Sequence, residues 1–144
     1  MEQSKKHLKI TSILALIFAG FSLFNLLGEL FWGDTSAFPD AITASTMLIA
    51  KIILFAITFL FILPQVYIGF KGLKMAKNPD SSKAHIIWAV ILFVFGFFGL
   101  ISSIIDVVNK ASTLNISAML TTVVELTIYF DYVKYAREVS KSVK

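Results

Sequence analysis

The sequence predicts an all-α, polytopic membrane protein, a single domain built as a bundle of four transmembrane helices. Two observations support this prediction. Of the 144 residues, 57% are hydrophobic and 15% are charged, whereas a soluble domain has about 45–50% apolar and about 25% charged residues. The charges gather at the two termini and in the middle of the chain. The apolar stretches between them are long enough to cross a bilayer, which takes about 20 residues.

The transmembrane helices are expected at residues 10–32, 43–70, 84–108 and 116–135. Polar segments rich in Gly, Pro, Asn and Asp separate them, because these residues interrupt helices. Pro64 is expected to bend the second helix, since proline removes a backbone donor. Strands are excluded because the apolar runs do not alternate with period two, and an open sheet cannot satisfy its backbone in lipid.

The first apolar run is expected to stay in the protein as a transmembrane helix. It is longer than the core of a secretory signal peptide, which has about 7–15 residues. It also ends in Glu29-Leu30-Phe31-Trp32 and lacks the small residues of a cleavage site.

The lysines predict the orientation. The N-terminus, the connection between the second and third helices and the C-terminal tail hold nearly all the basic residues, whereas the other two connections hold Asp34, Asp40 and a single Lys110. Cytoplasmic loops of membrane proteins carry an excess of Lys and Arg. We therefore expect a multi-pass protein of the cell membrane with both termini in the cytoplasm.

A shift of 77 positions places the first helix on the third and suggests two repeated helical hairpins. Phe18 then coincides with Phe95, and Glu29 with Asp106. Small residues coincide as well and lie on one face of each helix. These small faces contain Ala15, Ala19, Ser22, Ala89, Gly96, Gly99 and Ser103. Because small residues let transmembrane backbones approach closely, we expect the first and third helices to pack together. A chance similarity of common residues is the alternative.

Four ionisable residues lie inside the predicted spans, where each costs about 2.5–3.5 kcal/mol on insertion scales. Glu29, Lys51 and Asp106 are expected in the outer leaflet, and Glu125 near the centre of the fourth helix. One interpretation is a buried ion pair of Lys51 with Glu29 or Asp106. The other is a polar pocket that opens outward and binds a cation or relays a proton, with Glu125 as the acid most prone to stay protonated. Polar stripes on the second and fourth helices would extend this pocket through Thr58, Gln65, Thr122 and Tyr129.

Further basic residues and the histidines have simple interpretations. Lys71, Lys74 and Lys77 follow the second span and either mark the cytoplasmic side or bind anionic lipid headgroups or an acidic partner. His7 and His85 are interpreted as interfacial residues, because no carboxylate accompanies either at metal-ligand spacing. No metal site or cofactor is expected.

No enzyme motif is present, and the connections are too short for a soluble catalytic domain. The absence of cysteine excludes thiol catalysis. The net charge of +4 comes from residues that flank the spans, so we expect the lipid bilayer and its anionic headgroups as partners and no nucleic acid.

The segment Tyr67–Lys83, YIGFKGLKMAKNPDSSK, resembles the middle connection of small four-helix membrane proteins common in Gram-positive bacteria. The resemblance covers about one eighth of the chain. It implies a bacterial cell membrane and no particular activity.

Taken together, these features predict a non-enzymatic membrane protein that acts through partners. It would be an accessory subunit, an immunity-type protein against a membrane-active toxin, or a homo-oligomer. One alternative is a small cation or proton transporter or channel that uses the four ionisable residues. Another is a holin-like pore former, suggested by the small size, the several spans and the basic tail.

Overall fold

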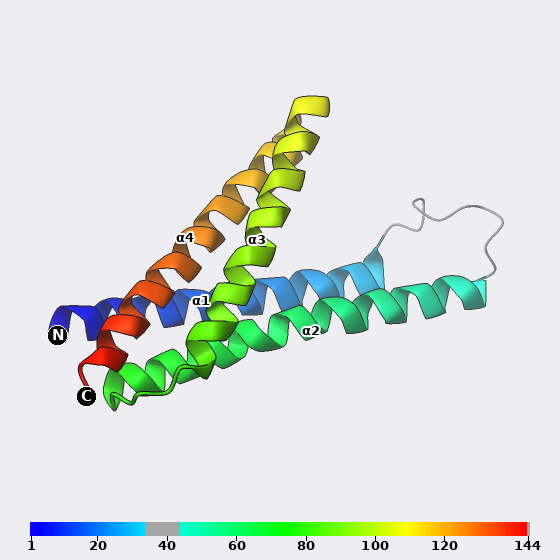
Figure 1. Ribbon diagram of the computed structural model, residues 1–144. Coiled ribbons are helices and arrows are strands. Elements are labelled where there is room, and N and C mark those ends of the chain that lie inside the picture. The colour runs from blue at the N-terminus through cyan, green and yellow to red at the C-terminus, as the bar shows by residue number, and fades with distance from the viewer. Residues whose placement is uncertain (34–43, 144) are drawn as a thin grey trace.

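A computed structural model describes residues 1–33 and 44–143. Within these residues all regular structure is helical, which confirms the predicted all-α class (Figure 1). The helices are α1 (Glu2–Trp32), α2 (Ala44–Lys77), α3 (Ala84–Asn109) and α4 (Thr113–Lys141). Each is long and apolar enough to cross a membrane, so the chain is a multi-pass membrane protein.

Three helices extend beyond their predicted limits. α1 begins at Glu2, α2 continues to Lys77, and α4 continues to Lys141. The apolar runs define the membrane spans, but Lys, Glu, Gln and Arg are good helix formers and continue the helices past the apolar residues. The polar connection after the first helix lies, except for Gly33, outside the described residues.

The helices form two hairpins, α1 with α2 and α3 with α4, which together resemble a letter V (Figure 1). We call the end where the hairpins converge the base and the opposite end the open end. The base holds the start of α1, the end of α4 and the 78–83 connection. Toward the open end the hairpins diverge, and no Cα atom of α1 lies within 8 Å of a Cα atom of α3 among the described residues.

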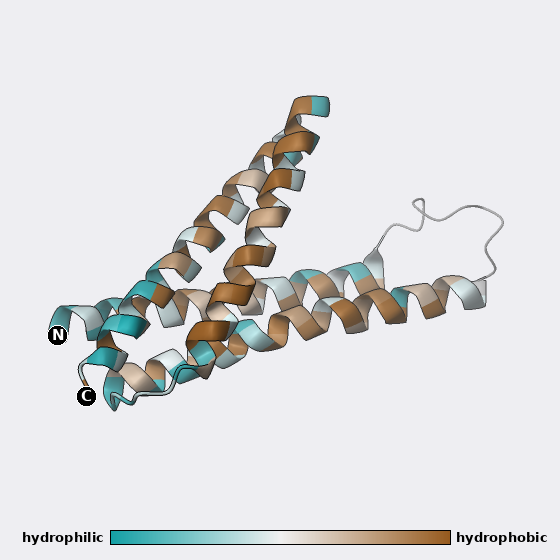
Figure 2. Cartoon of the chain, in the orientation of Figure 1, coloured by the Kyte–Doolittle hydropathy of each residue, from teal (hydrophilic) through white to brown (hydrophobic). Residues whose placement is uncertain are grey.

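The main hydrophobic core lies toward the base, because there all four helices contribute side chains to it. Its buried members are Leu8, Ala15, Ile68, Met75, Ile86, Ala89, Leu92, Ile128, Tyr129, Tyr132, Ala136 and Val139. A smaller cluster of Ala19, Leu26 and Ile62 holds α1 against α2. The rest of the helical surface exposes many large apolar side chains, as expected for contact with lipid. Figure 2 shows this division, with hydrophilic residues gathered at the base and hydrophobic ones along the arms.

The prediction that the first and third helices pack together is wrong. The small residues instead bring together the helices within each hairpin. A Cβ atom on Gly96 of α3 would lie 2.8 Å from Leu126 Cδ2 of α4, and one on Gly69 of α2 would lie 3.3 Å from the carbonyl oxygen of Ser12 of α1. Short connections make consecutive helices antiparallel neighbours, and this constraint decides which faces pack.

The remaining small-face residues divide between packed and open positions. Ala15, Ala19 and Ala89 are buried, Ser22 and Ser103 are half-buried, and Gly99 is exposed. A Cβ atom on Gly99 would meet nothing within 4 Å. The small faces therefore extend beyond the contacts that the chain makes with itself.

Candidate functional site

Three polar side chains form a cluster that links the two hairpins. Gln65 Nε2 of α2 donates a hydrogen bond to Glu125 Oε1 of α4 at 3.1 Å. The Tyr129 hydroxyl donates to the same oxygen at 2.7 Å. Gln65 and Tyr129 are buried, and Glu125 is half-buried. We call these three residues the Glu125 cluster.

The position of the cluster follows from helix geometry. Glu125 and Tyr129 are four residues apart, so they lie on the same face of α4. At 1.5 Å per residue, Glu125 is about 18 Å from the start of α4 and about 24 Å from its end. The cluster therefore lies in the middle of the span, where a carboxyl group needs partners of its own.

One acceptor of the cluster has no partner. Gln65 Oε1 is buried and accepts no hydrogen bond from the described residues. A buried polar atom without a partner costs about 1–3 kcal/mol. The cluster is therefore short of one hydrogen-bond donor.

The predicted ion pair of Lys51 is not formed. Lys51 and Glu29 line the same small cavity, of about 30 Å³, but no nitrogen–oxygen distance between them is within 4 Å. Lys51 Nζ instead donates to the carbonyl oxygen of Gly33 at 3.5 Å. The last carbonyl groups of a helix have no partner within the helix and attract cations. The ammonium group of Lys51 therefore has a backbone carbonyl at the end of α1 as its partner, and not a carboxylate.

The predicted pocket of four ionisable residues is also absent. Asp106 is exposed near the open end of the other hairpin, and its side chain forms no ion pair among the described residues. Glu29, Lys51 and Asp106 cannot converge because α1 and α3 diverge.

The predicted polar stripes are brought together in part. Gln65 and Tyr129 both donate hydrogen bonds to Glu125 Oε1. Thr58 and Thr122 instead donate to carbonyl groups of their own helices, each at 2.9 Å, to Leu54 and Ala118 respectively. Threonine hydroxyls often bond in this way to the preceding helical turn.

The three lysines at the end of α2 do not form one patch. Lys71 Nζ pairs with Asp80 Oδ2 at 2.8 Å, and Asp80 Oδ1 accepts a hydrogen bond from the backbone N–H of Ser82 at 3.0 Å. The hydrogen bond from Lys71 holds the pKa of the Asp80 carboxyl below its usual value. Lys74 and Lys77 remain exposed. Lys77 shares a hollow on the base with lysines of the first turns of α1.

A second buried network, in the base, was not foreseen. The Tyr132 hydroxyl donates to the carbonyl of Ile68 at 2.8 Å, and His85 Nδ1 lies 2.8 Å from that hydroxyl. His85 Nε2 lies 3.0 Å from the carbonyl oxygen of Ser82. His85, expected to be an ordinary interfacial residue at the start of the third span, is fully buried among the other helices. No sequence spacing links these residues, because they come from three helices and a connection.

This network holds α2, α3 and α4 together. Three hydrogen bonds need three donated hydrogens, whereas a neutral His85 imidazole supplies one N–H and the Tyr132 phenol supplies one O–H. With a neutral imidazole, one of the three contacts is therefore not a hydrogen bond. His7, the other histidine, stacks on the ring of Tyr135 with ring centres 4.7 Å apart.

Comparisons of the chain with protein families, with curated proteins and with solved structures find no match. The functional proposals therefore rest on the residues and distances described above.

Proposed function

We propose that the chain is a non-enzymatic membrane protein that acts through a partner, whose transmembrane helix lies between the two hairpins. A hollow of about 400 Å³ between α1 and α4 supports this proposal. Phe18 of α1 forms one side of the hollow, and Thr113, Ser117 and Thr121 of α4 line the other together with apolar residues. We call the side of α4 formed by Thr113, Ser117 and Thr121 the hydroxyl face.

The composition of the hydroxyl face favours a protein partner. Thr113, Ser117 and Thr121 recur every four residues, so they lie on one side of the helix, and all three are exposed. Small and hydroxyl-bearing residues are enriched where transmembrane helices pack, because they permit close approach and hydrogen bonds between helices. A face that contacts only lipid gains nothing from such residues.

The orientation proposed with this function places the base in the cytoplasm of a bacterial cell. The base holds most of the lysines, which are enriched in cytoplasmic segments. The hydroxyl face then lies in the outer half of the membrane. A second copy of the chain, a larger complex or a membrane-active toxin would each reach it by lateral diffusion.

Photo-cross-linking from a single cysteine tests the proposal, because the chain has no cysteine of its own and a benzophenone label inserts into C–H bonds without a thiol on the partner. Ser117→Cys places the labelled thiol on the hydroxyl face, and Val123→Cys places it on an exposed part of α4 outside the hollow. Irradiation of membranes from the source cell should cross-link the first variant and leave the second monomeric.

The mass of the product identifies the partner. A band at twice the 16.0 kDa of the chain indicates a second copy, and any other discrete mass indicates a different protein. Equal cross-linking of both variants, or none with Ser117→Cys, would contradict the proposal.

Proton or cation transport is the second candidate, and the unpartnered Gln65 Oε1 beside Glu125 favours it. The test is proton or cation flux into proteoliposomes. Transport should be present with the natural chain and abolished by Glu125→Gln. If the natural chain transports neither, this candidate is excluded.

A further inference from the structure

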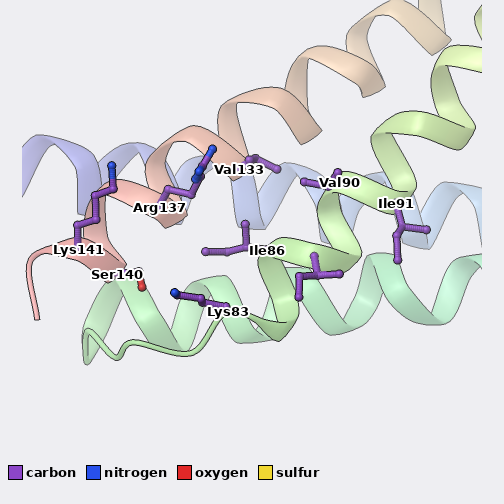
Figure 3. Close-up of a pocket in the computed structure, with 9 residues that line it drawn as sticks. Lys83, Ile86, Val90, Ile91, Val133, Arg137, Ser140 and Lys141 are labelled. Carbon is purple, nitrogen blue, oxygen red and sulfur yellow. The ribbon is translucent and has the colours of Figure 1, made fainter. Parts of the chain in front are cut away.

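A groove of about 480 Å³ lies between the first turns of α3 and the last turns of α4, on the side of the base (Figure 3). Much of its wall is apolar and consists of Ile86, Ile87, Val90, Ile91 and Val133. Lys83, Arg137 and Lys141 complete the lining together with Ser140. Figure 3 shows that Arg137 and Lys141 come from α4, whereas Lys83 is the residue just before α3.

The apolar and cationic residues are ordered by depth. Lys83 immediately precedes α3, and Ile91 lies about 12 Å further along the helix at 1.5 Å per residue. α4 runs in the opposite direction, so Val133 is the deep residue and Lys141 is the last residue of the helix. The positive charges of both helices therefore gather at one end of the groove and the apolar side chains at the other.

Among the residues that the structure describes, no carboxylate lines the groove, and its charged end has three cations. The nearest acids in the sequence are held elsewhere. Asp80 pairs with Lys71 at 2.8 Å, and Glu138 accepts a hydrogen bond from the Ser4 hydroxyl of α1 at 2.6 Å. The charge at this end is therefore available to an anion.

We propose that this groove binds one anionic phospholipid, with the phosphate between Lys83, Arg137 and Lys141 and one acyl chain along the apolar wall. The groove is open toward the bilayer, since the side chains of Ile87 and Val90 are 58% and 44% exposed. A lipid can therefore enter laterally without leaving the membrane.

The shape of the groove distinguishes a lipid from a soluble anion. A free phosphate would use only the charged end and leave the apolar wall uncovered. An acyl chain covers that wall, and its headgroup lies where the charges are. Anionic lipids attract each nearby Lys or Arg strongly enough to change relative binding about fivefold per charge.

Tryptophan fluorescence offers a direct test, because the chain has two tryptophans. Trp88 is adjacent to Ile87 in α3, whereas Trp32 is the last residue of α1 and lies far from the base. The Trp32→Phe variant retains Trp88 as a single reporter. It is reconstituted in phosphatidylcholine vesicles with rising fractions of brominated phosphatidylglycerol or brominated phosphatidylcholine, and quenching gives their relative binding.

The expected result is a preference of about 25-fold or more for phosphatidylglycerol, as two or more charges at about fivefold each imply. Adding Arg137→Gln and Lys141→Gln should reduce that preference about 25-fold and leave at most the roughly fivefold contribution of Lys83. The matched control is Lys5→Gln with Lys6→Gln, which removes the same charge from the other hollow of the base and should leave the preference unchanged.

Three outcomes would overturn the proposal. Equal quenching by the two lipids in the parent shows that the groove does not select an anionic lipid. Equal loss of preference in the control pair shows that the effect is the general charge of the base. Displacement of brominated phosphatidylglycerol by excess soluble glycerol phosphate, at constant ionic strength, shows that the occupant is a free anion.

Discussion

Replacing Gly72 by alanine should destabilise the base, because α1 and α4 both press against this glycine of α2. A Cβ atom there would overlap Ser12 Oγ and would lie 2.5 Å from Tyr132 Cε2. Favourable contacts between carbon atoms are about 3.5–4.0 Å long, so a neighbouring group must move by about 1 Å. Tyr132 is fully buried and hydrogen-bonded to Ile68, which prevents an easy rotation of its ring.

The magnitude follows from three terms. Overpacking a well-packed core costs about 1–3 kcal/mol. Loss of the hydrogen bond from Tyr132 to the Ile68 carbonyl adds about 1 kcal/mol. Alanine regains about 1 kcal/mol through its higher helix propensity. The expected net loss in free energy of unfolding is about 1–3 kcal/mol.

The assay is unfolding of the detergent-solubilised protein by dodecyl sulfate, followed by circular dichroism. Gly99→Ala is the matched control, because a Cβ atom there would meet nothing within 4 Å. It should leave the midpoint unchanged or raise it slightly. Ser12→Gly should recover part of the loss in the Gly72→Ala background, since it removes one of the overlapping atoms. Equal midpoints for Gly72→Ala and Gly99→Ala would refute the reasoning.

Three further substitutions have defined outcomes in the same titration. Tyr132→Phe removes a buried hydrogen bond to the Ile68 carbonyl, which keeps its donor within α2, and should cost about 1 kcal/mol; no change would show that this hydrogen bond contributes nothing. Asp80→Asn should cost at most about 1 kcal/mol at neutral pH, because its pair with Lys71 is partly exposed. The Lys71 pair lowers the pKa of Asp80 in the folded protein, so the loss of stability in Asp80→Asn should be present above the unfolded pKa of about 3.9. It should disappear as the pH falls through the folded pKa, and a loss that persists below that pKa would contradict the ion pair with Lys71. Lys51→Leu should not destabilise the protein, whereas loss of a buried ion pair would cost about 3–5 kcal/mol.

The number and type of the helices could be predicted from the sequence because run length and hydropathy depend on each segment alone. The arrangement of the hairpins could not. Ala19 is buried and Gly96 lies against Leu126, but the sequence does not say which helix such small residues face. That choice depends on the connections and on side chains far apart in the chain, such as Leu126 against Gly96.

The residues of the candidate site could be predicted, but not their contacts. Gln65, Glu125 and Tyr129 were expected on two polar stripes, but counting residues from Lys51 puts Gln65 well inward of Glu125, and the structure nevertheless joins them. Glu29 and Asp106 were placed at one level, but depth gives no lateral position, and they lie on diverging hairpins. The burial of His85 required knowledge of three other segments at once, which no local pattern supplies.

The convergence of the hairpins at the base gives each arm of the V the properties of a lever. Tyr132 lies near the pivot, and the far end of α4 at Thr113 is about 28 Å away at 1.5 Å per residue. A rotation of about 10° about that point displaces the far end by about 5 Å, close to one helical turn. A repacking of the base that rotated one hairpin by this amount would therefore move its open end by nearly the pitch of a helix.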